Sequence, residues 1–153
     1  MKNTVSNSLE ETQNIARKWL LSISDNSNNT EAVIIGLLGH LGSGKTTFTQ
    51  AIAKELGIED HVTSPTFVIM KTYETKNKRF PRLVHIDAYR LEFGRELEVL
   101  DFEEVVSNPN NLVLIEWADN VKEILPVNVR FIEFEAIGEN ERSIKFISNS
   151  IFE

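Results

Sequence analysis

The segment Gly39–Thr46 carries the residues best suited to bind a charged ligand. Its sequence, GHLGSGKT, completes the pattern G-x-x-x-x-G-K-[ST] and directly follows the apolar run of residues 32–38. Glycines permit positive φ values and a close approach of backbone N–H groups to an anion, and a helix that begins there adds the positive end of its dipole. The sequence therefore predicts that the chain binds a nucleoside triphosphate.

Two side chains of this segment have types that a structural turn would not require. Lys45 would place an ammonium group on the β- and γ-phosphates, and the hydroxyl of Thr46 is the expected magnesium ligand. Thr47 is interpreted as either a further nucleotide contact or an ordinary residue of the first helical turn. As a loop residue, Lys45 is expected to be exposed and to contribute little to the core.

An apolar strand that ends in an acid supplies a second part of the candidate site. Residues 112–115 are all apolar and Glu116 follows them. This form is typical of the Walker B segment of phosphate-loop enzymes, because ligands of open α/β sheets bind at the carboxyl ends of the strands. Glu116 is therefore the first candidate for the magnesium-site acid, and a solvent-facing glutamate is the alternative. Trp117 fits the core or the rim equally well.

A second acid, Asp87, also follows an apolar strand. The alternation of side chains places His85, Asp87 and Tyr89 on the same side of that strand. Asp87 is predicted to orient an attacking water or to hold magnesium through a water, and a structural turn carboxylate is the alternative. His85 is interpreted as structural, and Arg90 as a candidate partner of the γ-phosphate.

The hydroxyl residues before the next strand form a candidate switch segment. Thr63, Ser64 and Thr66 surround Pro65 in the loop that follows the phosphate-loop helix. Their hydroxyls, that of Thr66 included, would sense the γ-phosphate as switch loops do in nucleotide-dependent proteins. A proline turn that enters a strand is the alternative.

Elements that would position these residues follow from hydrophobic periodicity and from turn signals. A capping box of Ser8 and Glu11 opens the first predicted helix. The predicted helices span residues 9–21, 45–56, 94–106 and 119–125. The predicted strands span residues 32–38, 67–73, 83–87, 112–115, 129–136 and 143–148, with hairpins at 67–87 and 129–148 and a loop at 24–30.

Hairpins among βα units predict a mixed sheet. We therefore expect a three-layer α/β fold of the P-loop NTPase type, and 153 residues with 41% hydrophobic content fit one domain over 1–153.

Composition bears on the partners and on the compartment. The formal net charge is −7 and the pI is about 5.1, whereas tight nucleic-acid binding depends on lysine and arginine. A role in nucleic-acid metabolism would therefore be exercised through another protein. The chain has no cysteine, no apolar stretch long enough to span a bilayer and no signal-peptide pattern, which predicts a soluble, cytoplasmic protein that does not bind membranes.

Four motifs in this order resemble the bacterial TsaE family, also called YjeE. They are GHLGSGKTT at 39–47, SPTF at 64–67, HIDAYR at 85–90 and the pair Glu116-Trp117. The resemblance covers most of the chain. It implies an ATPase that supports the TsaB–TsaD heterodimer in the threonylcarbamoylation of adenosine 37 of tRNA, with tRNA contacted only indirectly.

The resemblance also implies roles for individual residues. Thr46 and Glu116 would bind magnesium, Asp87 would support hydrolysis and Trp117 would be a nucleotide-site or partner residue. The phosphates of ATP would lie against Leu41, Gly42, Ser43, Gly44, Lys45 and Thr46. Leu9, Asp119 and Gly138 would approach the nucleoside.

Two other functions remain open from the residues. A small-molecule kinase of the phosphate-loop class would share the opening motif, although such kinases use several clustered arginines to clamp the phosphoryl group. A nucleotide-dependent switch with negligible hydrolysis would share the carboxylates as well.

Overall fold

The computed structural model describes residues 2–25 and 30–147 and contains a seven-stranded sheet in the order β1-β7-β6-β2-β5-β4-β3. β2, β4, β5 and β6 pair in parallel, whereas β1, β3 and β7 pair antiparallel with their neighbours. The predicted mixed sheet is confirmed. The strands are β1 (Lys2–Ser6), β2 (Val33–Leu38), β3 (Met70–Glu74), β4 (Arg82–Asp87), β5 (Asn111–Glu116), β6 (Arg130–Ala136) and β7 (Arg142–Ile147).

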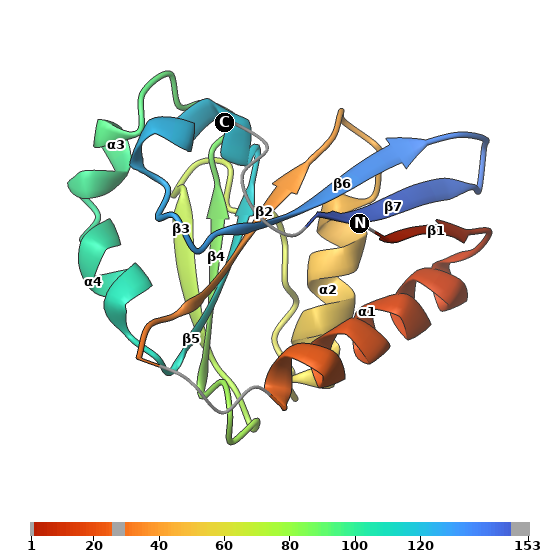
Figure 1. Ribbon diagram of the computed structural model, residues 1–153, viewed down its shortest axis with the longest axis horizontal. Helices are drawn as coiled ribbons and strands as arrows, with labels where there is room; N and C mark the ends of the chain where they lie inside the picture. Colours follow the sequence, from red (N-terminus) through yellow and green to blue (C-terminus); the bar gives the residue numbers. More distant parts are fainter. Residues whose placement is uncertain (1, 26–29, 148–153) are drawn as a thin grey trace.

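Helices cover both faces of this sheet (Figure 1). One face packs against α1 (Leu9–Ser24) and α2 (Lys45–Glu55), and the other packs against α3 (Arg95–Glu98), α4 (Phe102–Ser107) and the 3₁₀ helix η1 (Ala118–Ile124). Alternation along β2 serves both layers, because Ile35 and Leu37 join the α1–α2 cluster while Ile34 joins the other. The predicted three-layer α/β fold is therefore confirmed.

The two helices beside the candidate site begin as the sequence predicts. Ser8 caps α1 by accepting a hydrogen bond from the Glu11 amide at 3.1 Å, and the Glu11 carboxylate accepts one from the Asn7 amide. α2 begins directly after Gly44, whose φ of 109° requires a glycine. The N-terminus of α2 thus lies within the last residues of the phosphate-loop motif.

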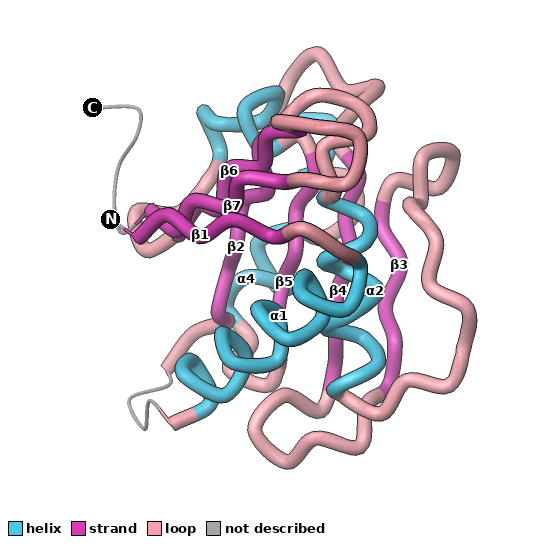
Figure 2. Tube along the Cα trace, turned by 90° about the vertical axis from the view of Figure 1, so that its right-hand side faces the viewer, coloured by secondary structure: helices cyan, strands magenta, loops and turns pink. Residues whose placement is uncertain are grey.

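Strand β1 was not expected, because Lys2–Ser6 lacks the apolar alternation of a buried strand. It forms through non-local pairing with β7 at the edge of the sheet, as Figure 2 shows. The strand predicted from Phe67 begins at Met70, since residues 66–69 form a turn in which Ile69 has a φ of 69°. These boundaries depend on tertiary contacts.

The predicted helix over 94–106 is wrong as a single element. Asp101, with a φ of 57°, divides it into α3 and α4. The predicted helix at 119–125 is the 3₁₀ helix η1, which is kinked at Val121. The predicted loop residues 26–29 and Ser148 lie outside the described residues. Within the described ranges, no helix has the length and apolar character needed to cross a membrane.

Candidate active site

A cavity of about 700 Å³ opens where the carboxyl ends of β2, β4 and β5 meet the start of α2. This volume is in the range of small-molecule and cofactor sites. It lies at the edge of the sheet where ligands of open α/β folds bind. Its lining comprises Asn7, Ser8, Leu9, Thr12, residues 41–47, Ser64, Thr66, Asp87, Tyr89, Glu116, Trp117, Glu139, Asn140 and Arg142.

The phosphate loop has the backbone of an anion site. Gly39, Gly42 and Gly44 have φ values of 144°, 77° and 109°, which L-residues adopt only with strain. The Ser43 amide donates to the His40 carbonyl at 3.1 Å and tightens the loop. The amides of Gly42, Gly44, Lys45 and Thr46 have no acceptor among the described residues. Such unpaired donors at a helix N-terminus fit the oxygens of a polyphosphate.

Lys45 is buried inside this loop, so the expectation that it would be exposed is wrong. Its Nζ donates to the carbonyls of Gly39 and His40, the latter at 2.9 Å, and lies 4.4 Å from the centroid of the Trp117 ring. Burial lowers the pKa of Lys45, while the charges of Glu116, Asp87 and Asp119 oppose that shift. The ammonium is therefore held by neutral oxygens that an anion can replace.

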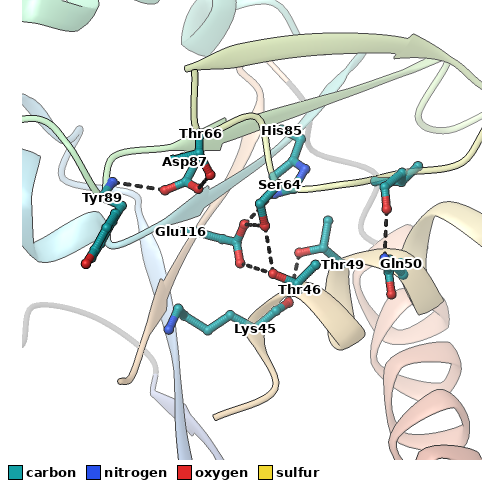
Figure 3. A network of polar contacts seen from close by, with 11 residues as sticks. Lys45, Thr46, Thr49, Gln50, Ser64, Thr66, His85, Asp87, Tyr89 and Glu116 are labelled. Atoms are coloured by element: carbon teal, nitrogen blue, oxygen red, sulfur yellow. Dashed lines mark hydrogen bonds and ion pairs between the residues drawn. The ribbon is translucent and has the colours of Figure 1, made fainter. Parts of the chain in front are cut away.

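Glu116 and two hydroxyl groups form a compact oxygen cluster beside the loop (Figure 3). Oε1 lies 2.8 Å from Thr46 Oγ1, Oε2 lies 2.8 Å from Ser64 Oγ, and the two hydroxyl oxygens are 2.7 Å apart. Two hydroxyl hydrogens cannot serve all three contacts at once, because each hydroxyl donates one hydrogen bond. At least one of the three oxygen pairs is therefore in contact without a hydrogen between the two oxygens.

That oxygen cluster fits magnesium. Two oxygen ligands on adjacent positions of an octahedral Mg²⁺ at about 2.1 Å lie about 3 Å apart, close to the spacing of Thr46 Oγ1 and Glu116 Oε1. Magnesium typically takes one or two protein oxygens and completes its shell with phosphates and water. Accordingly, the described residues contain no group of three or more His, Asp or Glu side chains arranged to hold a metal. Thr46 and Glu116 are the residues that would hold this ion.

His85 contacts the same carboxylate from the sheet. Its Nε2 lies 2.9 Å from Glu116 Oε2, and its side chain is completely buried. Burial alone would raise the pKa of Glu116. Hydrogen bonds from His85, Ser64 and Thr46, together with the electrostatic interaction with His85, outweigh that effect and lower the pKa below its ordinary value. The carboxylate is thus kept ionised in a buried position.

Asp87 is fixed at both oxygens. Oδ1 accepts a hydrogen bond from the Tyr89 amide at 2.9 Å, and Oδ2 accepts one from Thr66 Oγ1 at 3.0 Å. Asp87 is itself buried, yet it lines the cavity one strand away from Glu116, with which it is paired in the β4–β5 register. This arrangement presents a second, immobilised carboxylate to a bound ligand.

Most of the predicted site residues meet at this cavity. Leu9, the loop residues 41–47, Thr66, Asp87 and Glu116 line it, and so does Trp117. Thr47 lies in the first turn of α2 and also lines the cavity, and its contact with a nucleotide stays a prediction.

Three candidates are not among the residues that line the cavity. Among the described residues, the cavity lining does not include Asp119 or Gly138, although the neighbours Glu139 and Asn140 contribute to it. The guanidinium of Arg90 lies 4.6 Å from the ring centroid of Phe67 rather than in the cavity.

Two residues that contact Glu116, His85 and Ser64, have a larger part in the site than the sequence predicts, and several residues of the cavity wall, Arg142 among them, are not predicted at all. The sequence favours a structural role for His85 and does not distinguish Ser64 from the neighbouring hydroxyl residues. Alternation on β4 placed His85 on the side of Asp87 and was a signal for it. Arg142 lines the cavity, with its Nη1 donating to the carbonyls of Gly138, Glu139 and Glu141. Nothing local in the sequence indicated that position.

Comparison with known proteins agrees with this geometry. The family model for the threonylcarbamoyl adenosine biosynthesis protein TsaE matches residues 6–144. The tRNA threonylcarbamoyladenosine biosynthesis protein TsaE of Rickettsia felis is 36% identical over 94% of this chain and 78% of its own length. The protein of that name from Bacillus subtilis is 41% identical over 74% of this chain and 68% of its own length.

A solved structure supports the same assignment. The crystal structure of YdiB from Bacillus subtilis superposes with a TM-score of 0.74 at 30% identity, covering 97% of this chain and 86% of that one. Fold, sequence and family model therefore agree over nearly the whole described chain. The chain belongs to the TsaE family and shares its role in tRNA threonylcarbamoyladenosine biosynthesis.

Proposed function

We propose that this protein is a magnesium-dependent ATPase that supports the TsaB–TsaD complex in the threonylcarbamoylation of adenosine 37 of tRNA. One observation carries the ATPase part of the proposal. The hydroxyl of Thr46 and the carboxylate of Glu116 meet at 2.8 Å beside a loop in which four amides, those of Gly42, Gly44, Lys45 and Thr46, have no acceptor among the described residues. A polyphosphate with its magnesium ion would bind both, the phosphate oxygens at the loop amides and the ion at the Thr46 and Glu116 oxygens.

Each residue then has a defined task. The loop amides and Lys45 bind the phosphates. When a phosphate binds, the Lys45 ammonium donates to its oxygens instead of to the carbonyls of Gly39 and His40. Thr46 and Glu116 hold magnesium, which when bound neutralises charge on the phosphate oxygens. Asp87, held by Thr66 and Tyr89, orients the attacking water. Hydrolysis of this kind needs positioning more than covalent chemistry.

The partnership is proposed from the family and from the charge. A net charge of −7 opposes direct binding to the tRNA backbone, so the protein would act through partners that hold the tRNA. TsaB and TsaD are the proposed partners, and the cytoplasm is the proposed compartment. Hydrolysis by the isolated chain is expected to be slow.

The kinase alternative receives less support from the site. Among the described residues that line the cavity, Arg142 is the one arginine, and its Nη1 is already bound by three carbonyls of the 138–141 turn. A phosphoryl clamp of several arginines is therefore not assembled in the described part of the chain. The switch alternative uses the same carboxylates and differs only in the rate of hydrolysis.

Turnover measured with purified components tests the proposal. Phosphate release from ATP is followed for the isolated protein and after addition of TsaB and TsaD, with E116Q as the control variant. We expect slow basal release that requires magnesium and rises with the partners. A rate indifferent to TsaB and TsaD contradicts the partnership, and negligible release under all conditions favours the switch.

A further inference from the structure

The most thoroughly buried ionisable side chain beside the site is His85, whose exposed fraction is 0%. It lies on β4, where residues 83, 85 and 87 face α2, since Leu83 joins the α1–α2 cluster and Val84 joins the opposite one. Its Nε2 reaches Glu116 Oε2 at 2.9 Å, which leaves Oε1 to Thr46. The imidazole therefore lies on the far side of the carboxylate from the phosphate loop.

The surroundings of the second ring nitrogen, Nδ1, indicate which nitrogen of His85 carries the hydrogen. Nδ1 is buried and has no hydrogen-bond partner among the described residues. A buried N–H without an acceptor costs more than a buried lone pair, so the favoured neutral tautomer carries its hydrogen on Nε2. That hydrogen points to Glu116. The ring is thus a dedicated donor to one carboxylate oxygen.

We infer that His85 is a positioning residue for the magnesium site: it fixes the Glu116 carboxylate so that Oε1 faces Thr46 Oγ1 at the spacing of two metal ligands. The inference rests on the proposed function, because magnesium binding is part of that proposal. Carboxylate ligands of metals are commonly oriented by hydrogen bonds from outer residues. Ser64 shares Oε2 but sits on a loop, whereas His85 sits on a paired strand and supplies the rigid contact.

Two substitutions separate this role from core packing. H85L fills the buried position with an apolar side chain and removes the donor, whereas H85Q supplies an N–H group at a similar reach. V84A is the matched control, because Val84 is buried on the same strand but faces the opposite layer. It lowers stability without touching Glu116.

The readout is the affinity for a fluorescent, non-hydrolysable ATP analogue, titrated against magnesium concentration and repeated with EDTA. We expect H85L to raise the magnesium concentration needed for half-maximal binding about tenfold or more. Affinity in EDTA should stay unchanged, and H85Q should recover most of the loss.

Several outcomes overturn the inference. They are an H85L magnesium dependence equal to that of the wild type, an H85Q variant no better than H85L, or the same shift in V84A. Binding by the wild-type protein that does not depend on magnesium overturns the proposed metal site and this inference together. If the wild-type protein needs magnesium to bind the analogue and H85L needs the same magnesium concentration, only the inference about His85 fails and the proposed metal site stands.

Discussion

Thr46 and Glu116 lie 70 positions apart in the chain, yet their side-chain oxygens are 2.8 Å apart. Thr46 lies in the first turn of α2, and Glu116 is the last residue of β5. The parallel pairing of β2 with β5 brings these two segment ends to one edge of the sheet. The candidate metal site is therefore a direct product of the sheet topology.

Replacement of Lys45 by Met should weaken nucleotide binding about 100-fold, since charge-assisted hydrogen bonds contribute about 1.5–3 kcal/mol each. Met keeps the apolar stem of this buried side chain and removes its ammonium. Binding of the ATP analogue measured by calorimetry checks this. K45A removes the stem as well and should also lower the melting temperature. Unchanged affinity in K45M would show that the ammonium does not contact the phosphates.

Asp87→Asn should lower the single-turnover rate of ATP hydrolysis about 100-fold or more, because a neutral amide orients the attacking water less strongly than a carboxylate, which accepts hydrogen bonds at both oxygens. Affinity for the analogue should change less than about threefold, since the amide can still hold the contacts to Thr66 and the Tyr89 amide. T66V, which removes only the contact to Oδ2, is the milder control. A D87N variant that loses affinity but keeps its rate would assign Asp87 to binding instead.

Glu116 should make the protein without nucleotide and magnesium sensitive to acid. Its folded pKa lies below the unfolded value of 4.5, so near that pH the unfolded chain binds more protons. The stabilisation is fully present above about pH 4.5 and is lost as the pH falls through the folded pKa. Urea unfolding from pH 6 to pH 3 should show the wild-type advantage over E116Q shrinking with acid. A constant difference would refute this.

Gly36→Ala should lower the free energy of unfolding by about 1–3 kcal/mol through overpacking. A Cβ at this position on β2 would lie 2.7 Å from the Phe131 ring and 2.8 Å from the Ala118 Cβ. Urea denaturation provides the measurement. Val127→Ala, at a fully exposed position, should stay within about 0.5 kcal/mol of the wild type. A neutral G36A would mean that Phe131 can move aside.

The sequence was most informative where chemistry and local structure coincide. The phosphate loop, the start of α2 and the strand ending at Glu116 are encoded by contiguous residues, and the structure places them as predicted. The turn before β3 was not predictable in this way. Ser64 and Thr66 bind carboxylates from distant strands, and Phe67 is left exposed despite its apolar character.

His85 shows the same limit. A histidine on an apolar strand is compatible with core packing, and only the neighbouring strand determines what its Nε2 meets. Strand β1 likewise depends on β7, because its own residues carry no period-two apolar pattern. In both cases the missing information is non-local.

The register of the outermost strand pair links the amino terminus to ligand recognition. Ser6 pairs with Arg142, so the pairing of β1 with β7 holds the cavity-lining residues Asn7 and Ser8 close to Arg142, which also lines the cavity. Trimming residues 2–6 would free Asn7 and Ser8 from this pairing, whereas Arg142 would remain paired with Ala136 of β6. Recombinant versions of this protein are therefore better extended at other exposed positions, since changes at this end alter the pocket as directly as a mutation inside it.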